Sequence, residues 1–358
     1  MGVEEEFLLV DPISAATVPS APEVLGRVAG PLPAGAAAHA ELRATQVEFA
    51  TGVCGDAGGL RAQLRAGRRH LAAAAEAEGV LLVSAGTPVL GGPARRGDRL
   101  ERFAEIDERY AGMVADYEAC GCHVHVGVPD RDTAVAVVDR LRPWLPTLLA
   151  LSVNSPFARG RDTGYGSWRM VQQSRFPGSG VPPALGDRAG HDAAVARMVD
   201  CGVLVDERMT FWLARPSPTL PTVEFRVADA ATTVDEAVLF ALLARGLVRA
   251  ALAELGDDRP APFVDPQVAA AAVWSAARHG LAGPGVDCRR ARRVPAERLV
   301  AALVEHVRPA LAETGDLALV AELLDRVRRH GTGAERQRAA AGAGWVRAVH
   351  ALARATQA

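Results

Sequence analysis

Three consecutive glutamates stand near the start of the chain, inside a stretch whose other residues favour a β-strand. Alternate side chains of a strand share a face, so Glu4 and Glu6 would point to one side and Glu5 to the other. Val3 and Phe7 flank the triplet and are strand formers of the kind found within a sheet. Two carboxylates in such a place need a cation, although a solvated strand start is the simpler interpretation of an acidic triplet.

A second signal lies in CGCHVHVGV, residues 120–128, where His123 and His125 would share one face of a strand. Histidine is the commonest metal-binding side chain, so the pair suits a metal or a phosphate, but packed or surface histidines give the same pattern. Cys120 and Cys122 lack the wider spacing of cysteine zinc sites, so we expect both to be buried core residues.

A third signal is TVEFRVAD, residues 222–229, which predicts a strand with Glu224 and Arg226 on one face. A carboxylate and a guanidinium would then be presented together. The alternative is a simple ion pair, which contributes little at a surface.

Two further carboxylates, Glu41 and Glu48, lie in ELRATQVEF, residues 41–49. Their odd separation places them on opposite faces of a regular strand. Both can serve one site only if Glu41 precedes the strand or a bulge intervenes. Glu48 stands between Val47 and Phe49 and is the better candidate ligand.

The combined set is dominated by carboxylates with one or two imidazoles, and such hard donors favour Mg²⁺ or Mn²⁺ over zinc. The chain contains 40 residues of lysine and arginine together, and every one is arginine. A Walker-type phosphate loop and a pyridoxal Schiff base both require lysine and are excluded. Carboxylates around Mg²⁺, with arginines, are a plausible clamp for a nucleoside triphosphate.

The bulk composition points to a globular protein. Among 358 residues, 49% are apolar and 23% charged, with a formal net charge of -2, so no nucleic-acid footprint is indicated. No apolar run reaches the length of a membrane helix, and the strand-like start does not resemble a secretory signal. We therefore expect a cytoplasmic protein without nucleic-acid or membrane partners.

Predicted strands occupy the first two thirds of the chain, and helical sequence dominates from about residue 234 onward. Short, separated strands without regular βα alternation favour an α+β fold with an antiparallel sheet. No convincing linker interrupts the pattern, so we expect a single catalytic domain over residues 1–358.

Five motifs together resemble the carboxylate–amine ligases of the glutamate–cysteine ligase type 2 group. They are GVEEEF (2–7), CGCHVHVG (120–127), NSPFARGRDTGYGSWR (154–169), PTVEFRVAD (221–229) and GTGAERQR (331–338), in the family's order. The resemblance implies a glutamine-synthetase-like fold, in which a curved antiparallel sheet forms a half-barrel and helices pack on its outer face. It also implies a homodimer.

The resemblance implies an ATP-dependent ligation. A carboxylate, glutamate-like, would take the γ-phosphoryl group of ATP, and an amine, cysteine or another amino compound, would attack the acyl phosphate. The implied metal ligands for Mg²⁺ or Mn²⁺ are Glu4, Glu6, Glu41, Glu48, His123 and Glu224. Glu224 and Arg226 would be catalytic, with Arg226 stabilising the transferring phosphoryl group. Glu5 would be a bystander on the reverse face.

The same resemblance implies substrate contacts from the segment after residue 153 and nucleotide contacts from arginines. The implied substrate contacts are Asn154, Arg159, Tyr165 and Arg169, and the implied nucleotide contacts are Arg226, Arg169 and Arg336. The chain departs from the family pattern at Gly178, where an arginine is expected, and after Thr87, where a histidine is expected. These departures concern the substrate pocket and leave the metal ligands intact.

Two other functions fit part of the pattern. A metal-dependent hydrolase could use the His-x-His pair to activate water, but it would leave Glu4 and Glu6 unexplained. A non-catalytic relative could bind nucleotide without turning it over. Turnover of an amide without ATP would identify the first, and nucleotide binding without turnover the second.

Overall fold

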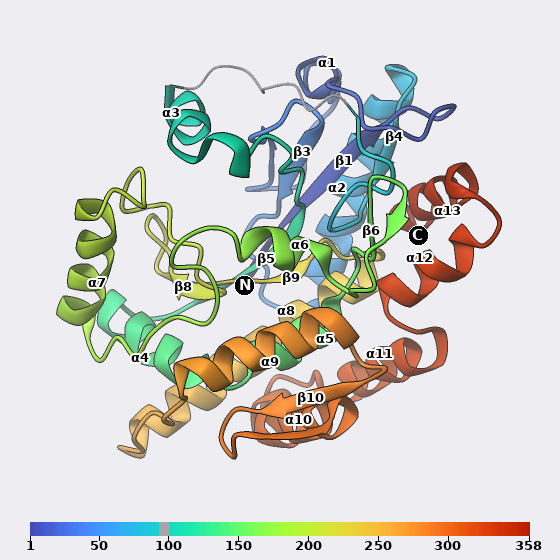
Figure 1. Cartoon of the computed structure of the whole chain (residues 1–358). Coiled ribbons are helices and arrows are strands. Elements are labelled where there is room, and N and C mark those ends of the chain that lie inside the picture. The colour runs from blue at the N-terminus through green and yellow to red at the C-terminus, as the bar shows by residue number, and fades with distance from the viewer. Residues whose placement is uncertain (93–100) are drawn as a thin grey trace.

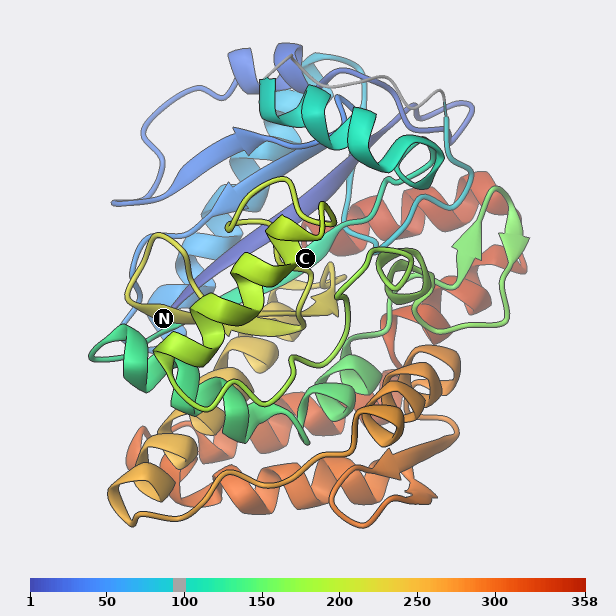
Figure 2. The same cartoon turned by 60° about the vertical axis from the view of Figure 1, so that its left-hand side comes forward.

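The computed structural model describes residues 1–92 and 101–358 and is organised around one antiparallel sheet (Figures 1 and 2). The strand order is β2–β3–β1–β5–β9–β8, with β4 paired to the far end of β1. The strands are β1 (Gly2–Val10), β2 (Ala37–Ala40), β3 (Gln46–Ala50), β4 (Leu81–Val83), β5 (Gly121–Gly127), β8 (Ala214–Pro216) and β9 (Thr222–Asp229). All of these pairings are antiparallel.

One face of the sheet is apolar because alternate residues of each strand are apolar. Val3, Val124 and Phe225 lie on this face and are buried in the main core. Helices cover it, and the longest of them, α8 (Val234–Gly256), is buried over most of its length. The others that line this core include α2 (Ala57–Ala77), α4 (Arg131–Leu141) and α5 (Leu145–Ser152).

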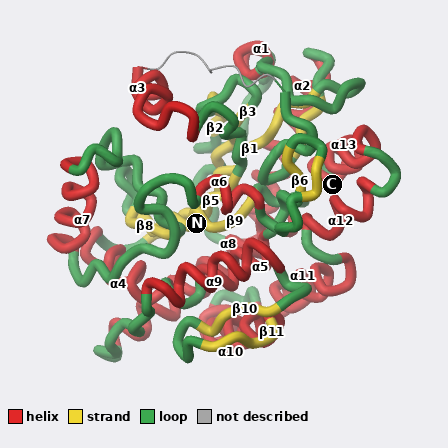
Figure 3. The backbone as a smooth tube through the Cα atoms, viewed as in Figure 1, coloured by secondary structure: helices red, strands yellow, loops and turns green. Residues whose placement is uncertain are grey.

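The remaining elements surround this sheet and its helices (Figure 3). They are α1 (Ala21–Gly26), α3 (Glu101–Tyr110), the 3-10 turn Ala111–Met113, β6 (Phe157–Ala158), β7 (Arg161–Asp162), α6 (Trp168–Gln173), α7 (Arg188–Asp200), α9 (Pro266–His279), β10 (Pro284–Asp287), β11 (Arg292–Pro295), α10 (Ala296–Glu313), α11 (Leu317–His330), α12 (Gly333–Ala341) and α13 (Trp345–Thr356). None of the helices in the described ranges has the length and apolarity that crossing a membrane requires.

The α+β prediction is confirmed, with an open antiparallel sheet and helices on one of its faces. Helices dominate from Val234 onward as expected, but the β10–β11 hairpin interrupts them. The segment after residue 153 is more ordered than its composition indicates, since Ser155 and Ser167 both donate hydrogen bonds to the buried Asp229 at 2.7 Å. This carboxylate therefore anchors the segment to the end of β9.

Glu5 points to the reverse face, as alternation predicts, but it is not a bystander. It is 1% exposed and forms a two-pronged ion pair with Arg68 of α2, through Nε at 2.9 Å and Nη2 at 2.5 Å. Arg68 also donates hydrogen bonds to the carbonyls of Ala231, Thr232 and Thr356. The correction has a physical reason: a carboxylate buried among helices needs a counter-charge, and α2 supplies it.

Replacing Arg68 with methionine should therefore destabilise the fold severely. Removing one partner leaves a buried, uncompensated Glu5 carboxylate, which typically costs about 3–5 kcal/mol. Urea unfolding monitored by circular dichroism measures the change. The matched control is Arg69→Met, because the neighbouring Arg69 is exposed and should shift stability by less than about 0.5 kcal/mol. Equal stability of the two variants would contradict this account.

Candidate active site

The strand register brings the predicted acidic residues onto the face of the sheet opposite to α8. Glu6 of β1 lies across from Glu48 of β3, and Glu4 lies across from His123 of β5. On the next pair of strands, His125 lies across from Glu224. The ligand-type side chains thus form a row that crosses four adjacent strands.

The first cluster consists of Glu4, His125 and Glu224. One potential ligand atom from each lies within 4.8 Å of the others, the spacing of a metal site. His125 Nε2 is 3.3 Å from a Glu4 oxygen, and its Nδ1 is 2.9 Å from the Thr222 hydroxyl, which fixes the ring.

The second cluster consists of Glu6, Glu41 and Glu48, again with ligand atoms within 4.8 Å. Glu41 directly follows β2 and precedes β3, so it escapes the alternation that would have turned it away from Glu48. This is the arrangement that the sequence required for both residues to serve one site. The Gly121 N–H donates to Glu6 at 2.6 Å and orients that carboxylate.

His123 lies between the two clusters. Its Nδ1 is 3.5 Å from Glu4 and its Nε2 is 3.9 Å from Glu6. The predicted ligand His123 is therefore close to both clusters, whereas His125 belongs to the first. The His-x-His pattern indicated both histidines, but the resemblance included only His123 in the ligand set.

The carboxylates of the second cluster repel one another. Burial raises the pKa of Glu48 well above its usual value, and the nearby Glu41, Glu4 and Glu6 raise it further. Burial likewise raises the pKa of Glu6 and of Glu41. A divalent cation would relieve this repulsion and restore the ionised forms.

In the first cluster the net effect on the pKa of the carboxylate Glu4 is the opposite. Burial raises the pKa of Glu4, but contacts with His123 and His125 outweigh it and hold that pKa well below its usual range. Burial also lowers the pKa of His123, assisted by the charge of Arg226, and so favours the neutral imidazole that binds metals.

Glu224 is held between two arginines. Arg215 of β8 donates through Nε at 2.8 Å, and Arg226 donates through Nη1 at 2.5 Å. Burial raises the pKa of Glu224, but these two guanidinium groups outweigh it and hold the pKa well below the usual value. Arg215 also binds the Arg208 and Thr210 carbonyls, whereas Arg226 Nε is buried without a hydrogen bond among the described residues.

Arg169 adds a second incompletely satisfied guanidinium. Its side chain is buried, and Nη2 donates to the Arg226 carbonyl at 3.2 Å, but Nε and Nη1 lack hydrogen-bond acceptors in the described part of the chain. Asp229 lies 3.9 Å from Nη1. A side chain at Gly121 would press against this guanidinium and His123, which explains the glycine. Buried N–H groups without acceptors are a ready site for an anion.

The donor set fits one or two hard divalent cations. It offers five carboxylates and two imidazoles, and the buried Nε2 atoms of His123 and His125 make no aligned hydrogen bond with any described residue. Carboxylates at this spacing, with few sulfur donors, are typical of Mg²⁺ or Mn²⁺ sites. Cys120 and Cys122 are buried core residues, as expected, and are not ligands.

Three predicted substrate residues have other contacts. The Asn154 side chain donates to the Ser84 and Ala230 carbonyls and accepts from Gln337, so its amide serves the packing of this region. Arg159 is exposed and pairs with Asp116 at 2.9 Å. The Tyr165 hydroxyl accepts from Trp274, away from the carboxylates, in the wall of an apolar hollow described below.

Arg336 does not join the cluster. It donates to the Gly331 carbonyl at 2.7 Å and to Glu236 in the first turn of α8 at 2.6 Å. Because α8 packs on the reverse face of the sheet, these contacts hold Arg336 in a structural role at a helix start. The structure therefore does not bring Arg336 together with the two clusters, and its contact with the nucleotide remains a prediction.

The chain matches the family model described as glutamate–cysteine ligase family 2 over residues 1–351. It is 58% identical over 354 residues to a Saccharopolyspora erythraea protein named "Putative glutamate–cysteine ligase 2-2", covering 98% of this chain and 90% of that one. It is 46% identical to a Mycolicibacterium vanbaalenii protein of the same name, with 95% and 92% covered.

Two solved structures share the fold. A glutamate–cysteine ligase from Francisella tularensis in complex with AMP aligns with a TM-score of 0.68 at 14% identity, covering 100% of this chain and 88% of that one. A bifunctional glutathione synthetase from Pasteurella multocida aligns with a TM-score of 0.66 at 16% identity, covering 99% and 52%. The chain therefore belongs to glutamate–cysteine ligase family 2, which confirms the resemblance and makes it an ATP-dependent carboxylate–amine ligase.

Proposed function

We propose that the protein uses ATP and Mg²⁺, or Mn²⁺, to join a glutamate-like carboxylate to cysteine or another amine through an acyl phosphate. The observation that carries the proposal is the pair of three-ligand clusters beside two guanidinium groups with free N–H donors. Such a surface can hold a polyphosphate and its counter-cations together. The names of the relatives support glutamate and cysteine as the first substrates to test.

In this proposal Glu4, His125 and Glu224 would hold one cation, and Glu6, Glu41 and Glu48 a second, with His123 between them. Cations held there would supply positive charge that offsets the charge of the phosphates. Arg226, oriented by Glu224, would donate to the γ-phosphoryl oxygens. Arg169 would supply a second set of donors to a phosphate or a substrate carboxylate.

The reaction would proceed in two transfers. A substrate carboxylate oxygen attacks the γ-phosphorus, the bond to the bridging oxygen breaks, and ADP leaves. The amine then attacks the acyl carbon, phosphate leaves, and an amide remains after the amine loses a proton. Excluding water from the acyl phosphate between these steps would prevent its hydrolysis.

The direct test is ADP release from Mg-ATP, with glutamate and other carboxylic acids offered with and without cysteine and other amines. Release that needs one acid and one amine, with the amide found by mass spectrometry, would establish the reaction. Hydroxylamine in place of the amine should trap the acyl phosphate as a hydroxamate. ATP binding without release for every pair would favour the non-catalytic relative.

Replacing Arg226 with alanine should lower kcat for ADP release by about 10²–10³-fold, the usual effect of losing a donor to the transition state. The fold should survive, because Glu224 keeps its ion pair with Arg215. Arg215→Ala provides the comparison and should lower the unfolding temperature more, since it frees the Arg208 and Thr210 carbonyls. Activity that falls only in proportion to the folded fraction would count against a catalytic Arg226.

Replacing Glu48 with glutamine should stabilise the metal-free protein at pH 8. The folded pKa of Glu48 is raised, so the folded state holds a proton that the unfolded chain releases, and stability falls as pH rises above the ordinary value of 4.5. Each unit of this shift corresponds to about 1.4 kcal/mol. Below the ordinary value the advantage of the variant should vanish.

Thermal unfolding in EDTA and in Mg²⁺, at pH 4 and pH 8, measures both effects. Mg²⁺ should stabilise the wild type at pH 8 and stabilise Glu48→Gln less, because a ligand is lost. Glu76→Gln, at an exposed position of α2, is the control and should follow the wild type. A Glu48→Gln variant that is less stable than the wild type in EDTA at pH 8 would disprove the repulsion.

We also propose that residues 1–358 act as one catalytic domain and that the protein is a homodimer. The sequence without a convincing linker supports the first and the resemblance supports the second, which sedimentation equilibrium of the purified protein tests.

A further inference from the structure

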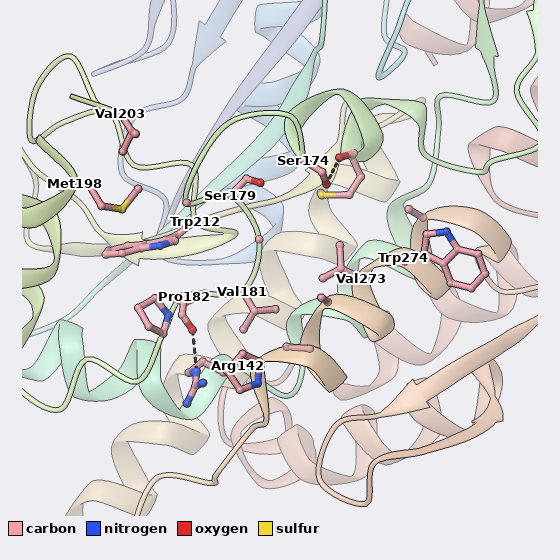
Figure 4. Close-up of a pocket in the computed structure, with 18 of the residues that line it drawn as sticks. Arg142, Ser174, Ser179, Val181, Pro182, Met198, Val203, Trp212, Val273 and Trp274 are labelled. Atoms are coloured by element: carbon pink, nitrogen blue, oxygen red, sulfur yellow. Dashed lines mark hydrogen bonds between the residues drawn. The ribbon is translucent and has the colours of Figure 1, made fainter. Parts of the chain in front are cut away.

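A large apolar hollow lies beside the site, separate from the metal-ligand clusters. It has a volume of about 960 Å³, near the upper end for small-molecule sites. Its walls come from α6, α7, α9, the segment 178–183 and Trp212, and in Figure 4 Met198 and Trp212 face Val273 across Val181. None of the residues that line it belongs to the clusters of Glu4 or Glu6.

Gly178 helps to keep this hollow open. Its φ of +73° lies in the left-handed region, and a Cβ there would collide with the Met198 side chain. This is the position at which the sequence departs from the family pattern. An arginine in its place would be strained and would displace Met198 from the wall.

The charges that line the hollow are all positive. Of the residues that the structure describes, Arg142 and Arg197 are the only charged ones in the lining, and none of the lining residues is acidic. Arg142 is buried and donates to the carbonyls of Pro182 at 2.9 Å and Val264 at 3.2 Å, but its Nη1 has no acceptor among the described residues (Figure 4). The Asp139 carboxylate influences Arg142 through its charge but lies beyond ion-pair distance, and Arg197 is exposed at the rim of the hollow.

A ligand for this hollow must satisfy both features. Apolar walls favour an aliphatic or aromatic body. Two guanidinium groups without carboxylate partners favour an anionic head, because no acidic side chain of the lining neutralises their charge. A cationic amine would be repelled, and a sugar or nucleotide would leave most of its hydroxyl groups without partners.

We infer that the hollow binds a small organic carboxylate with an apolar body, with its head at Arg197 on the rim and its body against Met198, Trp212 and Val273, while Arg142 adds positive charge to the lining. The inference does not depend on the proposed ligation. The hollow nevertheless adjoins the site, because Met170 in its wall directly follows Arg169 and Trp212 lies at the start of the segment that becomes β8.

The test is binding of octanoate and 4-phenylbutyrate to the full-length protein, by calorimetry and by the fluorescence of Trp212 and Trp274, which line the hollow. One molecule of acid should bind saturably, and the matching amides, octanamide and 4-phenylbutyramide, should bind at least tenfold more weakly. Equal binding of acid and amide, or no saturable binding of either acid, would overturn the inference.

Variants localise the binding. Ala270→Trp, at an exposed lining position of α9, should occupy part of the hollow and weaken binding of the acid at least tenfold, and Arg197→Gln should weaken binding of the acid but not of the amide. Arg188→Gln, on the same helix as Arg197 but outside the hollow, should bind like the wild type. Unchanged affinity in Ala270→Trp would place the binding elsewhere and refute the site.

One further measurement distinguishes whether the bound acid is a substrate or an effector of the protein. ADP release from Mg-ATP that requires the bound acid, with the acid recovered as an amide, would identify a substrate. Recovery of the acid unchanged would identify an effector, and both outcomes require the same binding. Failure of the ligase reaction itself would leave the calorimetric result intact, so the two proposals fail separately.

Discussion

The buried ion pair between Glu5 and Arg68 is the interaction on which the arrangement of the site depends. It joins the middle of β1 to α2, and the same guanidinium binds carbonyls after β9 and near the end of α13. Four segments distant in sequence are therefore fixed at one point behind the sheet. An ion pair with this many hydrogen bonds has little freedom to shift, so it contributes more to specificity of arrangement than to net stability.

That fixed point also sets the direction of every ligand on β1. Side chains alternate along a strand, so a slip of one residue would bury Glu4 and Glu6 among the helices and expose Glu5 to the site. The cost of an unpaired buried carboxylate opposes the slip. The three glutamates thus have two functions. Glu4 and Glu6 face the site, where Glu4 contacts His123 and His125, whereas Glu5 fixes the register of β1 through its ion pair with Arg68.

Strand alternation was sufficient to predict much of this from sequence. It placed Glu4 and Glu6 on one face of their strand, the resemblance added Glu48 and Glu224 as ligands, and these four carboxylates do lie together in two clusters. It could not supply contacts set by tertiary structure, such as the partner of Glu5 or the approach of Arg215 from a three-residue strand. Nor could it predict that Arg336 pairs with Glu236 at the start of α8, because sequence gives the face of a strand residue but not the side on which a later helix packs. The aligned motifs identified the family, whereas the apolar hollow could not be predicted because it depends on the packing of segments that are separate in the sequence.

The contact between Arg68 and the Thr356 carbonyl has a consequence for synthesis on the ribosome. Arg68 leaves the ribosome 288 residues before Thr356, one of the acceptors that satisfy it, and Thr356 also receives the Ser84 N–H through its hydroxyl. A nascent chain released before Thr356 would keep an unsatisfied guanidinium at its centre. Termination at such a point would thus yield a molecule with both acidic clusters and a defective interior, a form that cellular quality control can distinguish from a chain that includes Thr356.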